Sequence, residues 1–318
     1  MKKTGLLLLL MATAAWSQNA TEAPADPQGT SSTTSTFPTL RVQMPTYADL
    51  YCAGFISKQI LPDANFVAGG LQTPTTTKFI RGDMIYLYGT GYAAGGEYEI
   101  VRALRDLNEY EIYPGQRKLL KETGQPYEEV ARIKIIDTRQ RTAIAQIEYA
   151  CDGVNPGDTA IPFVEKQAIT FHAPVHFDRF LPATAGKLSG RIVLGKDFDT
   201  QLGTGNKVYL NVGANQGVKI GDYFRAVRSY ESDLNNPVDS LSFKAAIAED
   251  TQMKSPSIDP TMLSPRTKGP VIHVRDLPRR AVGEIVILGV TNTTATGMIV
   301  FSLEDVHAGD DVESDTIN

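Results

Sequence analysis

The chain has 318 residues, which is enough for two domains of ordinary size that each bury a hydrophobic core. Hydrophobic residues make up 42% of the sequence and charged residues 21%, a composition that excludes a disordered or fibrous chain. The net charge is −5 and no long basic block is present, which argues against nucleic acid and anionic lipid surfaces as partners, because both attract concentrated positive charge.

Residues 1–17 have the composition of a cleaved secretory signal peptide. Lys2 and Lys3 provide a basic start, an apolar run follows, and Ala15-Trp16-Ser17 offers small residues three and one before the cut. No other apolar stretch approaches the roughly 20 residues needed to span a bilayer. We therefore expect a periplasmic or secreted mature chain that begins near Gln18, lacks tryptophan and has no membrane-spanning segment. A retained membrane anchor is the alternative.

Residues 18–39 are expected to form a flexible tether. The segment is rich in Ala, Pro, Ser and Thr, and Phe37 is its one large apolar residue. Such a segment cannot bury enough apolar surface to offset the entropy of ordering its backbone. An adaptor segment that binds a partner is the alternative.

An internal repeat organises the rest of the chain. The stretch "IYLYGTGYAAGGEYEIVR" at residues 85–102 resembles "VYLNVGANQGVKIGDYFRAVR" at residues 208–228. Residues 130–158 also align with residues 282–310 without a gap, at a constant offset of 152. Three shorter blocks extend the alignment toward the start of each unit: 54–57 with 190–193 as an opening strand, 82–87 with 205–210, and 96–98 with 221–223. The sequence therefore predicts two duplicated units, residues 40–162 and 190–318.

Each unit is expected to be mainly β, in the form of a small barrel or sandwich. The apolar segments are short, rich in β-branched and aromatic residues, and bounded by Gly, Asn or Asp, while helical periodicity is largely missing. Five to seven short strands in units of about 110 residues are typical of a small barrel. Glycines that supply positive φ and aspartates that form local hydrogen bonds are expected at the structural turns: Gly157, Asp158, Gly217, Gly221, Asp222, Gly309 and Asp310.

Two segments fall outside the repeated blocks. Residues 163–189, which contain Pro174 and Pro182, are expected to form an extended connector between the units. Residues 229–277 are an insertion in the second unit that is punctuated by five prolines, and we expect a long surface loop there. This loop is the first candidate for a segment that grips a partner.

Cys52 and Cys151 are predicted to form a disulfide within the first unit. Cys52 stands two residues before Gly54, where the opening strand is expected, and Cys151 directly follows the strand "AIAQIEY". In a barrel closed by its first and last strands these two ends become neighbours, and an exported protein meets an oxidising compartment. The aligned residues in the second unit, Leu188 and Leu303, are expected to make an apolar contact instead. Two separate buried thiols are the alternative.

No arrangement of residues predicts catalysis, a metal site or a cofactor. His172 and His176 form an H-x₃-H pair, but Pro174 between them prevents the helix that would align both rings, and no further ligand stands nearby at a recognisable spacing. The glycine-rich residues 89–97 lead from one strand into another, so no helix N-terminus faces a phosphate there. His273 and His307 are isolated, and the common hydrolase, metalloprotease and P-loop motifs are missing. A non-enzymatic protein is expected, and an envelope hydrolase with an unrecognised site is the weaker alternative.

The second unit resembles the C-terminal domain of the flagellar assembly protein T family, a periplasmic protein of the flagellar basal-body ring. The resemblance is carried by "VYLNVGANQGVKIGDYFRAVR", "VGEIVILGVTNTTATGMIV" and "VHAGDDVE". The unit is also similar to units of secreted bacterial proteins, many of which carry a LysM peptidoglycan-binding module, although no LysM sequence is recognisable here. The resemblance implies an envelope structural or assembly protein that docks another envelope component.

Peptidoglycan or glycan binding is the alternative to this docking role. A glycan site is expected to use exposed aromatic side chains in a groove. Four tyrosines of the first unit are the clustered aromatic candidates in the sequence: Tyr88, Tyr92, Tyr110 and Tyr113.

Overall fold

The structure is a computed structural model that describes residues 42–71, 76–105, 111–169, 179–180, 187–229, 251–252, 272–273 and 278–315. These residues belong to one compact unit, Leu40–Asn318. The predicted signal peptide and tether, more than half of the predicted connector and most of the predicted insertion lie outside the described residues. No helix in the described ranges is long and apolar enough to cross a membrane.

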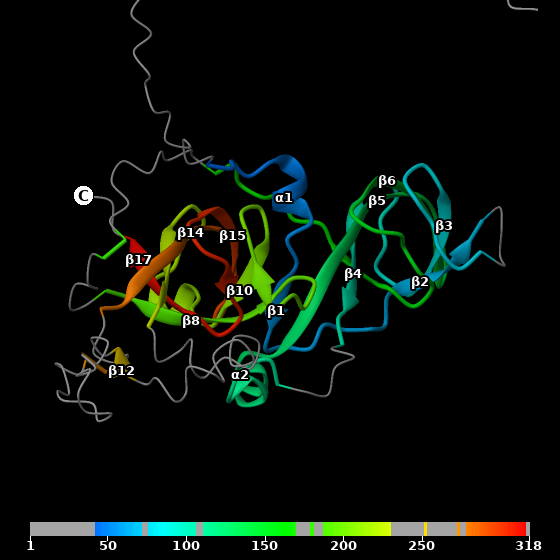
Figure 1. The fold of residues 1–318 in the computed structure, drawn as a ribbon. Helices are drawn as coiled ribbons and strands as arrows, with labels where there is room; N and C mark the ends of the chain where they lie inside the picture. Colours follow the sequence, from blue (N-terminus) through cyan, green and yellow to red (C-terminus); the bar gives the residue numbers. More distant parts are fainter. Residues whose placement is uncertain are drawn as a thin grey trace, which may run out of the picture. The chain divides into compact units, whose positions relative to one another are not determined.

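The described chain is mainly β and folds into two closed, six-stranded antiparallel barrels (Figure 1). In the first barrel the strand order is β5-β4-β7-β2-β3-β6, and β6 closes the ring by pairing with β5. These strands are β2 (Phe66–Gly70), β3 (Met84–Tyr88), β4 (Glu97–Ala103), β5 (Gln125–Arg139), β6 (Thr142–Ala150) and β7 (Thr159–Pro162). In the second barrel the order is β10-β15-β14-β11-β17-β8, and β8 closes on β10. These strands are β8 (Ser189–Gly195), β10 (Lys207–Leu210), β11 (Tyr223–Arg228), β14 (Arg280–Val290), β15 (Ala295–Ser302) and β17 (Asp311–Asp315).

The remaining described elements are short. Helix α1 (Tyr47–Tyr51) leads into β1 (Phe55–Ser57), which pairs with β5 outside the ring, and helix α2 (Gln116–Thr123) lies between β4 and β5. A 3-10 helix, η1 (Ala214–Gln216), follows β10. Two further pairs of strands complete the set: β9 (Gln201–Leu202) with β16 (Val306–His307), and β12 (Thr251–Gln252) with β13 (Ile272–His273). The β12–β13 pair lies within the predicted insertion.

The two barrels repeat each other strand for strand. The strands β2 to β7 correspond in order to β8, β10, β11, β14, β15 and β17. With this correspondence, each strand has equivalent neighbours in the two rings. The pair Ile133–Ile147 recurs as Ile285–Ile299, at the predicted offset of 152. Both register shifts of the β5–β6 ladder also recur at this offset between β14 and β15. The duplication is therefore confirmed.

The predicted opening strand was wrong. Residues 54–57 match residues 190–193 in sequence, but the strand equivalent to β8 is β2, because Val67 pairs with Leu87 as Ile192 pairs with Leu210. The strand β1 lies outside the ring and pairs with the first half of β5. A short Gly-x-Ile pattern fits almost any strand edge, so it carries little information about position.

One other block was misaligned by one residue. Gly95, not Gly96, is equivalent to Gly221, because their backbone N–H groups donate to Ile135 and Ile287, which are themselves 152 residues apart. Two adjacent glycines made the sequence alignment ambiguous at this point. The block that pairs residues 82–87 with residues 205–210 is confirmed, because Met84 faces Gln146 as Lys207 faces Met298.

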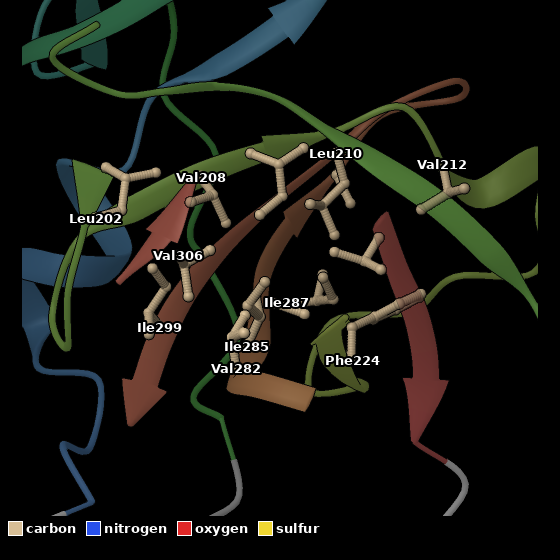
Figure 2. Packing of buried hydrophobic residues seen from close by; sticks show 14 of the residues in the cluster. Leu202, Val208, Leu210, Val212, Phe224, Val282, Ile285, Ile287, Ile299 and Val306 are labelled. Atoms are coloured by element: carbon tan, nitrogen blue, oxygen red, sulfur yellow. The ribbon is translucent and has the colours of Figure 1, made fainter. Parts of the chain in front are cut away.

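Each barrel encloses an apolar core. In the second barrel, inward-facing aliphatic and aromatic side chains fill the ring (Figure 2), among them Val208, Leu210, Phe224, Ile285 and Ile299. Their spacing of two residues along a strand directs alternate side chains inward. Each such side chain contributes about 1.5–3 kcal/mol when fully buried.

The outer faces of the two barrels differ. Strands β14 and β15 of the second barrel are buried on both faces, and a second cluster that includes Val286, Leu288 and Met298 lies outside the ring against Ala53 and Leu50. In the first barrel the same ladder has exposed residues on its outer face, such as Ile136 and Gln146. The reason for the difference is the segment that precedes the first barrel.

Candidate functional site at the junction of the two barrels

The segment from Thr46 to Ser57 belongs to the first repeat but lies on the second barrel, and we call it the docked segment. It starts with a helix cap: Asp49 N–H donates to Thr46 Oγ1 at 3.3 Å, and Thr46 N–H donates to Asp49 Oδ2 at 2.8 Å. The other oxygen of Asp49 pairs with Lys207 of β10. Burial opposes ionisation of Asp49, but the hydrogen bonds from Lys207 and Thr46 outweigh it and lower the pKa of this carboxyl.

Three side-chain hydroxyls of the second barrel hold the backbone of the docked segment. Tyr209 donates to Ala53 O at 3.1 Å, Thr296 donates to Gly54 O at 2.9 Å, and Thr294 donates to Ile56 O at 2.8 Å. All three donors are buried. Each bond satisfies a backbone carbonyl that would otherwise be buried without a partner, so the contact fixes the path of the chain.

Gly54 is required at the centre of this contact. Its φ is +72°, a left-handed conformation that other residues adopt at a cost. A Cβ atom there would also collide with the Tyr209 hydroxyl and come within 2.7 Å of the Tyr127 carbonyl oxygen. The second barrel and β5 therefore both approach the backbone at a point where only glycine fits.

A second contact joins the barrels near helix α2. The Tyr113 hydroxyl donates to Val193 O at 3.0 Å, and Gln116 Nε2 donates to the same carbonyl at 3.3 Å. Val193 belongs to β8, so the start of α2 and the loop before it are hydrogen-bonded to a strand of the second barrel. Two separate sets of buried hydrogen bonds therefore join the two barrels.

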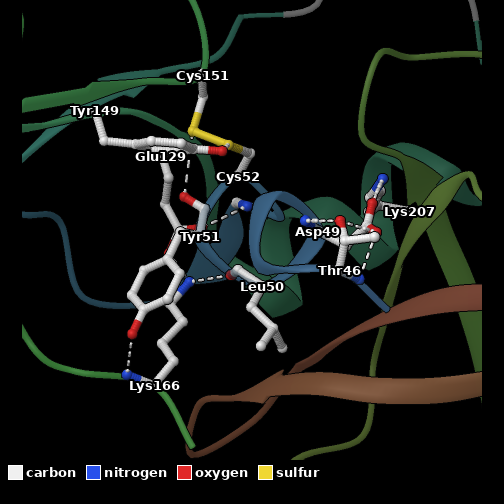
Figure 3. The surroundings of a disulfide bond; sticks show 11 residues. Thr46, Asp49, Leu50, Tyr51, Cys52, Glu129, Tyr149, Cys151, Lys166 and Lys207 are labelled. Carbon is white, nitrogen blue, oxygen red and sulfur yellow. Dashed lines mark hydrogen bonds and ion pairs between the residues drawn. A yellow bond between two sulfur atoms is a disulfide. The ribbon is translucent and has the colours of Figure 1, made fainter. Parts of the chain in front are cut away.

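The docked segment is also tied to the first barrel by a disulfide. Cys52 and Cys151 are bonded, with Cα atoms 5.5 Å apart (Figure 3), so the predicted disulfide is confirmed. The reasoning behind that prediction was wrong, because the ring closes without β1. The cysteines meet because β1, which follows Cys52, and β6, which precedes Cys151, both pair with β5.

The predicted apolar pair of Leu188 and Leu303 does not form. Strand β8 begins beyond the Leu210 end of β10, while β15 ends beyond the Lys207 end, so the two leucines lie at opposite ends of the barrel. Leu188 packs against the barrel interior, and Leu303 is exposed. The prediction depended on equating β1 with β8, which the strand pairing contradicts.

A buried polar cluster lies beside the disulfide (Figure 3). Glu129 of β5 accepts hydrogen bonds from Gly54 N–H at 3.0 Å and from the Lys166 ammonium. Lys166 Nζ also donates to Leu50 O at 2.7 Å, and its backbone N–H donates to the Tyr51 hydroxyl at 3.0 Å. Lys166 thus fixes the start of the predicted connector to the docked segment and to the first barrel.

This cluster lines a small cavity at the junction. The cavity has a volume of about 170 Å³, and both barrels contribute to its lining, with Glu129 and Lys166 on one side and Leu288 and Thr296 on the other. Glu99 on β4 forms a hydrogen bond with Glu129, and burial and the charge of Glu129 raise the pKa of Glu99 to about 8. At neutral pH the cluster therefore contains a protonated Glu99 and a lysine–carboxylate pair.

The cluster acts as a structural tie. Glu129 and Lys166 pair with each other, and both also contact backbone groups of the docked segment. Among the described residues, no group of three or more His, Cys, Asp or Glu side chains is arranged to hold a metal ion. The chemistry that this arrangement supports is the fixing of three chain segments to one another.

The protonated state of Glu99 gives the first testable prediction. A folded-state pKa of about 8 against an ordinary value of 4.5 means that the folded state favours the protonated carboxyl. The folded state then binds more protons than the unfolded state between these values, so the free energy of unfolding falls as pH rises from 4.5 to about 8. Glu99→Gln keeps a hydrogen-bond donor toward Glu129 and is expected to be more stable than wild type at pH 9 by roughly 2 kcal/mol.

Chemical unfolding at pH 5 and at pH 9 checks this expectation. The stability gain of Glu99→Gln over wild type should be present at pH 9 and small at pH 5. Glu284 is the matched control, because burial and the charge of Asp315 raise its pKa to about 7. Glu284→Gln should remove a separate fall in the free energy of unfolding, which is complete at a lower pH than the fall caused by Glu99. An unchanged pH dependence in Glu99→Gln would show that Glu99 is ionised in the folded state.

The predicted turn residues occupy two places. Asp158 and Asp310 accept paired hydrogen bonds from Arg102 and Arg228, at 2.7–2.9 Å, and each aspartate also accepts from the backbone N–H three residues before it. Their neighbours Gly157 and Gly309 both have positive φ. The remaining predicted turn residues lie at one end of the second barrel, where they line a cavity of about 420 Å³: Gly217, Gly221 and Asp222.

The arginine–aspartate pairs were not predicted. Both arginines close an aligned block and both aspartates sit at aligned turns, so the four residues recur together in the two repeats. In each barrel the arginine also donates to a carbonyl, that of Gly153 or Asp305, at 2.7 or 2.6 Å. The joint recurrence of an arginine and an aspartate is the signal that identifies such a pair.

The aromatic and histidine candidates are dispersed. Tyr113 is buried in the junction, whereas Tyr92 donates to the Tyr88 carbonyl at 3.2 Å, and burial raises the pKa of Tyr92 to about 12. His307 is buried in the turn held by Asp310. Three candidates lie outside the described residues: Tyr110, His172 and His176. For His273 only the backbone is described.

The functional inference rests on these residues and their geometry, because comparison with known proteins adds no match. No family model and no curated protein matches the chain. The likeness of the second unit to the flagellar assembly protein T family stays a prediction that depends on the sequence blocks that carry it.

Proposed function

We propose that the chain is an exported, non-enzymatic structural or assembly protein of the cell envelope, which docks another envelope component through its joined pair of barrels. The observation that carries this proposal is the junction. Three buried hydroxyls, the Lys207–Asp49 pair and the Tyr113–Val193 contact fix one barrel on the other. Two barrels held in this way present their outer surfaces at a constant spacing, as a scaffold requires.

The cysteine pair supports export. A disulfide between residues 99 positions apart is typical of compartments beyond the cytoplasm, where thiols are oxidised. The composition of residues 1–17 supports the same compartment, and removal of Lys2 and Lys3 leaves a net charge of −7. In this proposal residues 18–39 are the N-terminal tether of the cleaved chain.

Glycan binding has less support. A groove for sugars needs aromatic faces that are exposed together. Tyr113 is used inside the junction, and Tyr92 packs edge-on against Tyr98. Among the described tyrosines that suggested a glycan site, Tyr113 therefore does not share a surface with Tyr88 and Tyr92, and peptidoglycan binding enters as an outcome of the test below.

Export is tested by N-terminal sequencing of the protein recovered from the cell envelope. We expect the mature chain to begin near Gln18 and to show no tryptophan fluorescence, because Trp16 is the only tryptophan. Purified protein is then incubated with purified peptidoglycan and sedimented, and we expect it to stay in the supernatant. Envelope material that begins at Met1 contradicts the predicted cleavage, and co-sedimentation with peptidoglycan replaces the docking role with glycan binding.

A further inference from the structure

The duplication allows the outer faces of the two barrels to be compared residue by residue. In the second barrel, the face across β10, β15 and β14 is covered by the docked segment, and we call it the covered face. Its central residues Tyr209, Thr296 and Leu288 are each 3% exposed or less. Two of them donate hydrogen bonds to the docked segment, and Leu288 packs in the same cluster as Ala53.

The equivalent face of the first barrel runs across β3, β6 and β5, and we call it the open face. Tyr86 pairs with Ile144 as Tyr209 pairs with Thr296. Ile136 stands at the register shift of β5, where Leu288 stands in β14. Tyr86 is 39% exposed and Ile136 is 49% exposed, so apolar side chains at positions that are covered in one barrel are in contact with solvent in the other.

The open face keeps the hydrogen-bond donors that hold the docked segment on the covered face. Tyr86 takes the place of Tyr209, and Thr142 takes the place of Thr294, 152 residues later. Both hydroxyl-bearing residues are exposed. Only the central donor differs, since Ile144 replaces Thr296 and makes the middle of the face more apolar. The two retained donors correspond to those that reach Ala53 O and Ile56 O; Ile56 lies in the extended strand β1, and Ala53 precedes the left-handed Gly54.

The charges around the open face specify a further property of its partner. Lys134 lies beside Gln146 at one end of the face, and Arg141 lies over the Tyr88 ring at the other. The described residues contain no ion pair with either of these two side chains. On the covered face a lysine is paired with Asp49 of the docked segment, so an acidic residue on the bound chain meets a basic residue on the barrel. At the open face Met84 stands at the position of Lys207, and Lys134 and Arg141 supply the basic charge from other positions, which favours an acidic partner.

From these four observations we propose that the open face binds an extended, acidic and apolar segment of another envelope protein. Tyr86 and Thr142 donate to two backbone carbonyls of that segment, Ile136 and Ile144 pack against its apolar side chains, and Lys134 or Arg141 pairs with its carboxylate. Recognition through backbone carbonyls and alternate side chains is the usual way in which a β surface receives an extended peptide. The inference rests on the docking role proposed above and identifies the surface that performs it.

A synthetic peptide tests the chemistry of the face directly. The probe has the sequence of residues 46–57, with serine in place of Cys52, and carries a dye; it is titrated into the full-length protein, whose own docked segment occupies the covered face. We expect saturable binding that weakens about fivefold in Tyr86→Phe and in Thr142→Val, since each removes one hydrogen bond. Lys134→Glu should weaken binding tenfold or more. Thr90→Val, which alters an exposed threonine in a turn, is the matched control and should leave binding unchanged.

Binding that survives in Tyr86→Phe, Thr142→Val and Lys134→Glu places the peptide elsewhere and overturns the proposal, as does the lack of saturable binding. Circular dichroism of each variant confirms that the barrels are intact. Because all three substituted side chains lie on the outer face, we expect unchanged spectra.

Crosslinking in cells then separates this inference from the proposed function. A photoreactive residue is placed at Ile136 on the open face or at Val164, an exposed residue of the predicted connector. We expect Ile136 to form an adduct with another envelope protein, with the crosslink mapped by mass spectrometry to an extended segment that contains Asp or Glu. The adduct should be lost when Lys134→Glu is added and kept when Thr90→Val is added.

Each other outcome decides one of the two proposals. An adduct from Val164 but not from Ile136 keeps the docking role and overturns the open face as its surface. An adduct that contains two copies of this chain, or glycan, overturns the partner chemistry stated here. If neither position forms an adduct, the docking role itself fails.

Discussion

Replacement of both Cys52 and Cys151 by alanine is expected to lower the free energy of unfolding by about 4 kcal/mol. The disulfide closes a loop between residues 99 positions apart, so its loss gives the unfolded chain a large gain in conformational freedom. Urea unfolding followed by circular dichroism provides the measurement. Wild-type protein in reducing buffer should unfold at the same urea concentration as the double variant, and the reductant should not affect the variant further.

A difference of less than 1 kcal/mol between oxidised wild type and the double variant would contradict this expectation. Such a result would mean that other contacts restrict β1 and helix α1 even in the unfolded ensemble, so that the disulfide removes little further conformational freedom. Cys52→Ala alone is a poor substitute for the double variant, because it leaves Cys151 as a reactive thiol.

The second large effect is expected at the buried arginine–aspartate pair of the second barrel. Asp310→Asn should lower the free energy of unfolding by about 3–5 kcal/mol, because it removes the carboxylate that accepts two hydrogen bonds from the buried Arg228 guanidinium. Arg228 and Asp310 have side chains that are each 5% exposed. The equivalent variant, Asp158→Asn, is a control within the same protein, since Arg102 is more exposed and also pairs with Glu128 and Asp152.

We expect Asp158→Asn to cost only about 1–2 kcal/mol, because solvent and the two other carboxylates compensate Arg102. Urea unfolding of both variants gives the comparison. A third variant that changes Arg228 to Met together with Asp310 to Leu should recover part of the loss, because it removes both charges. Equal losses in the two single variants would show that burial does not set the strength of these pairs.

The repeated strands were predictable from the sequence because the pattern that specifies them is local. Residues 130–158 and 282–310 carry alternating apolar side chains at the same positions, and these side chains face the interior of each ring. The place of β1 was not predictable in the same way. Three residues with a generic strand composition fit several sheet edges, and only the long-range pairing of Phe55 with Tyr127 selects one of them.

The junction was beyond prediction for a related reason. Thr294 and Thr296 contact carbonyls that are 238 and 242 positions away in the chain. A threonine in a strand is common whether its hydroxyl faces solvent or another barrel, so residue type alone does not identify the donor. Gly54 was noted as the start of a strand, although its actual role is to let the Tyr209 hydroxyl approach the backbone. Such roles follow from which barrel lies on which face, and that is decided by the whole chain.

The position of the disulfide also sets an order of assembly. Both cysteines precede the second barrel in the chain, so their bond needs none of the second barrel to form. A chain that emerges from a membrane with its N-terminus first can therefore fix the docked segment to the completed first barrel and then wait for β10, β14 and β15. The same bond holds the segment at the first half of β5, where β1 pairs, before any strand of the second barrel has been made.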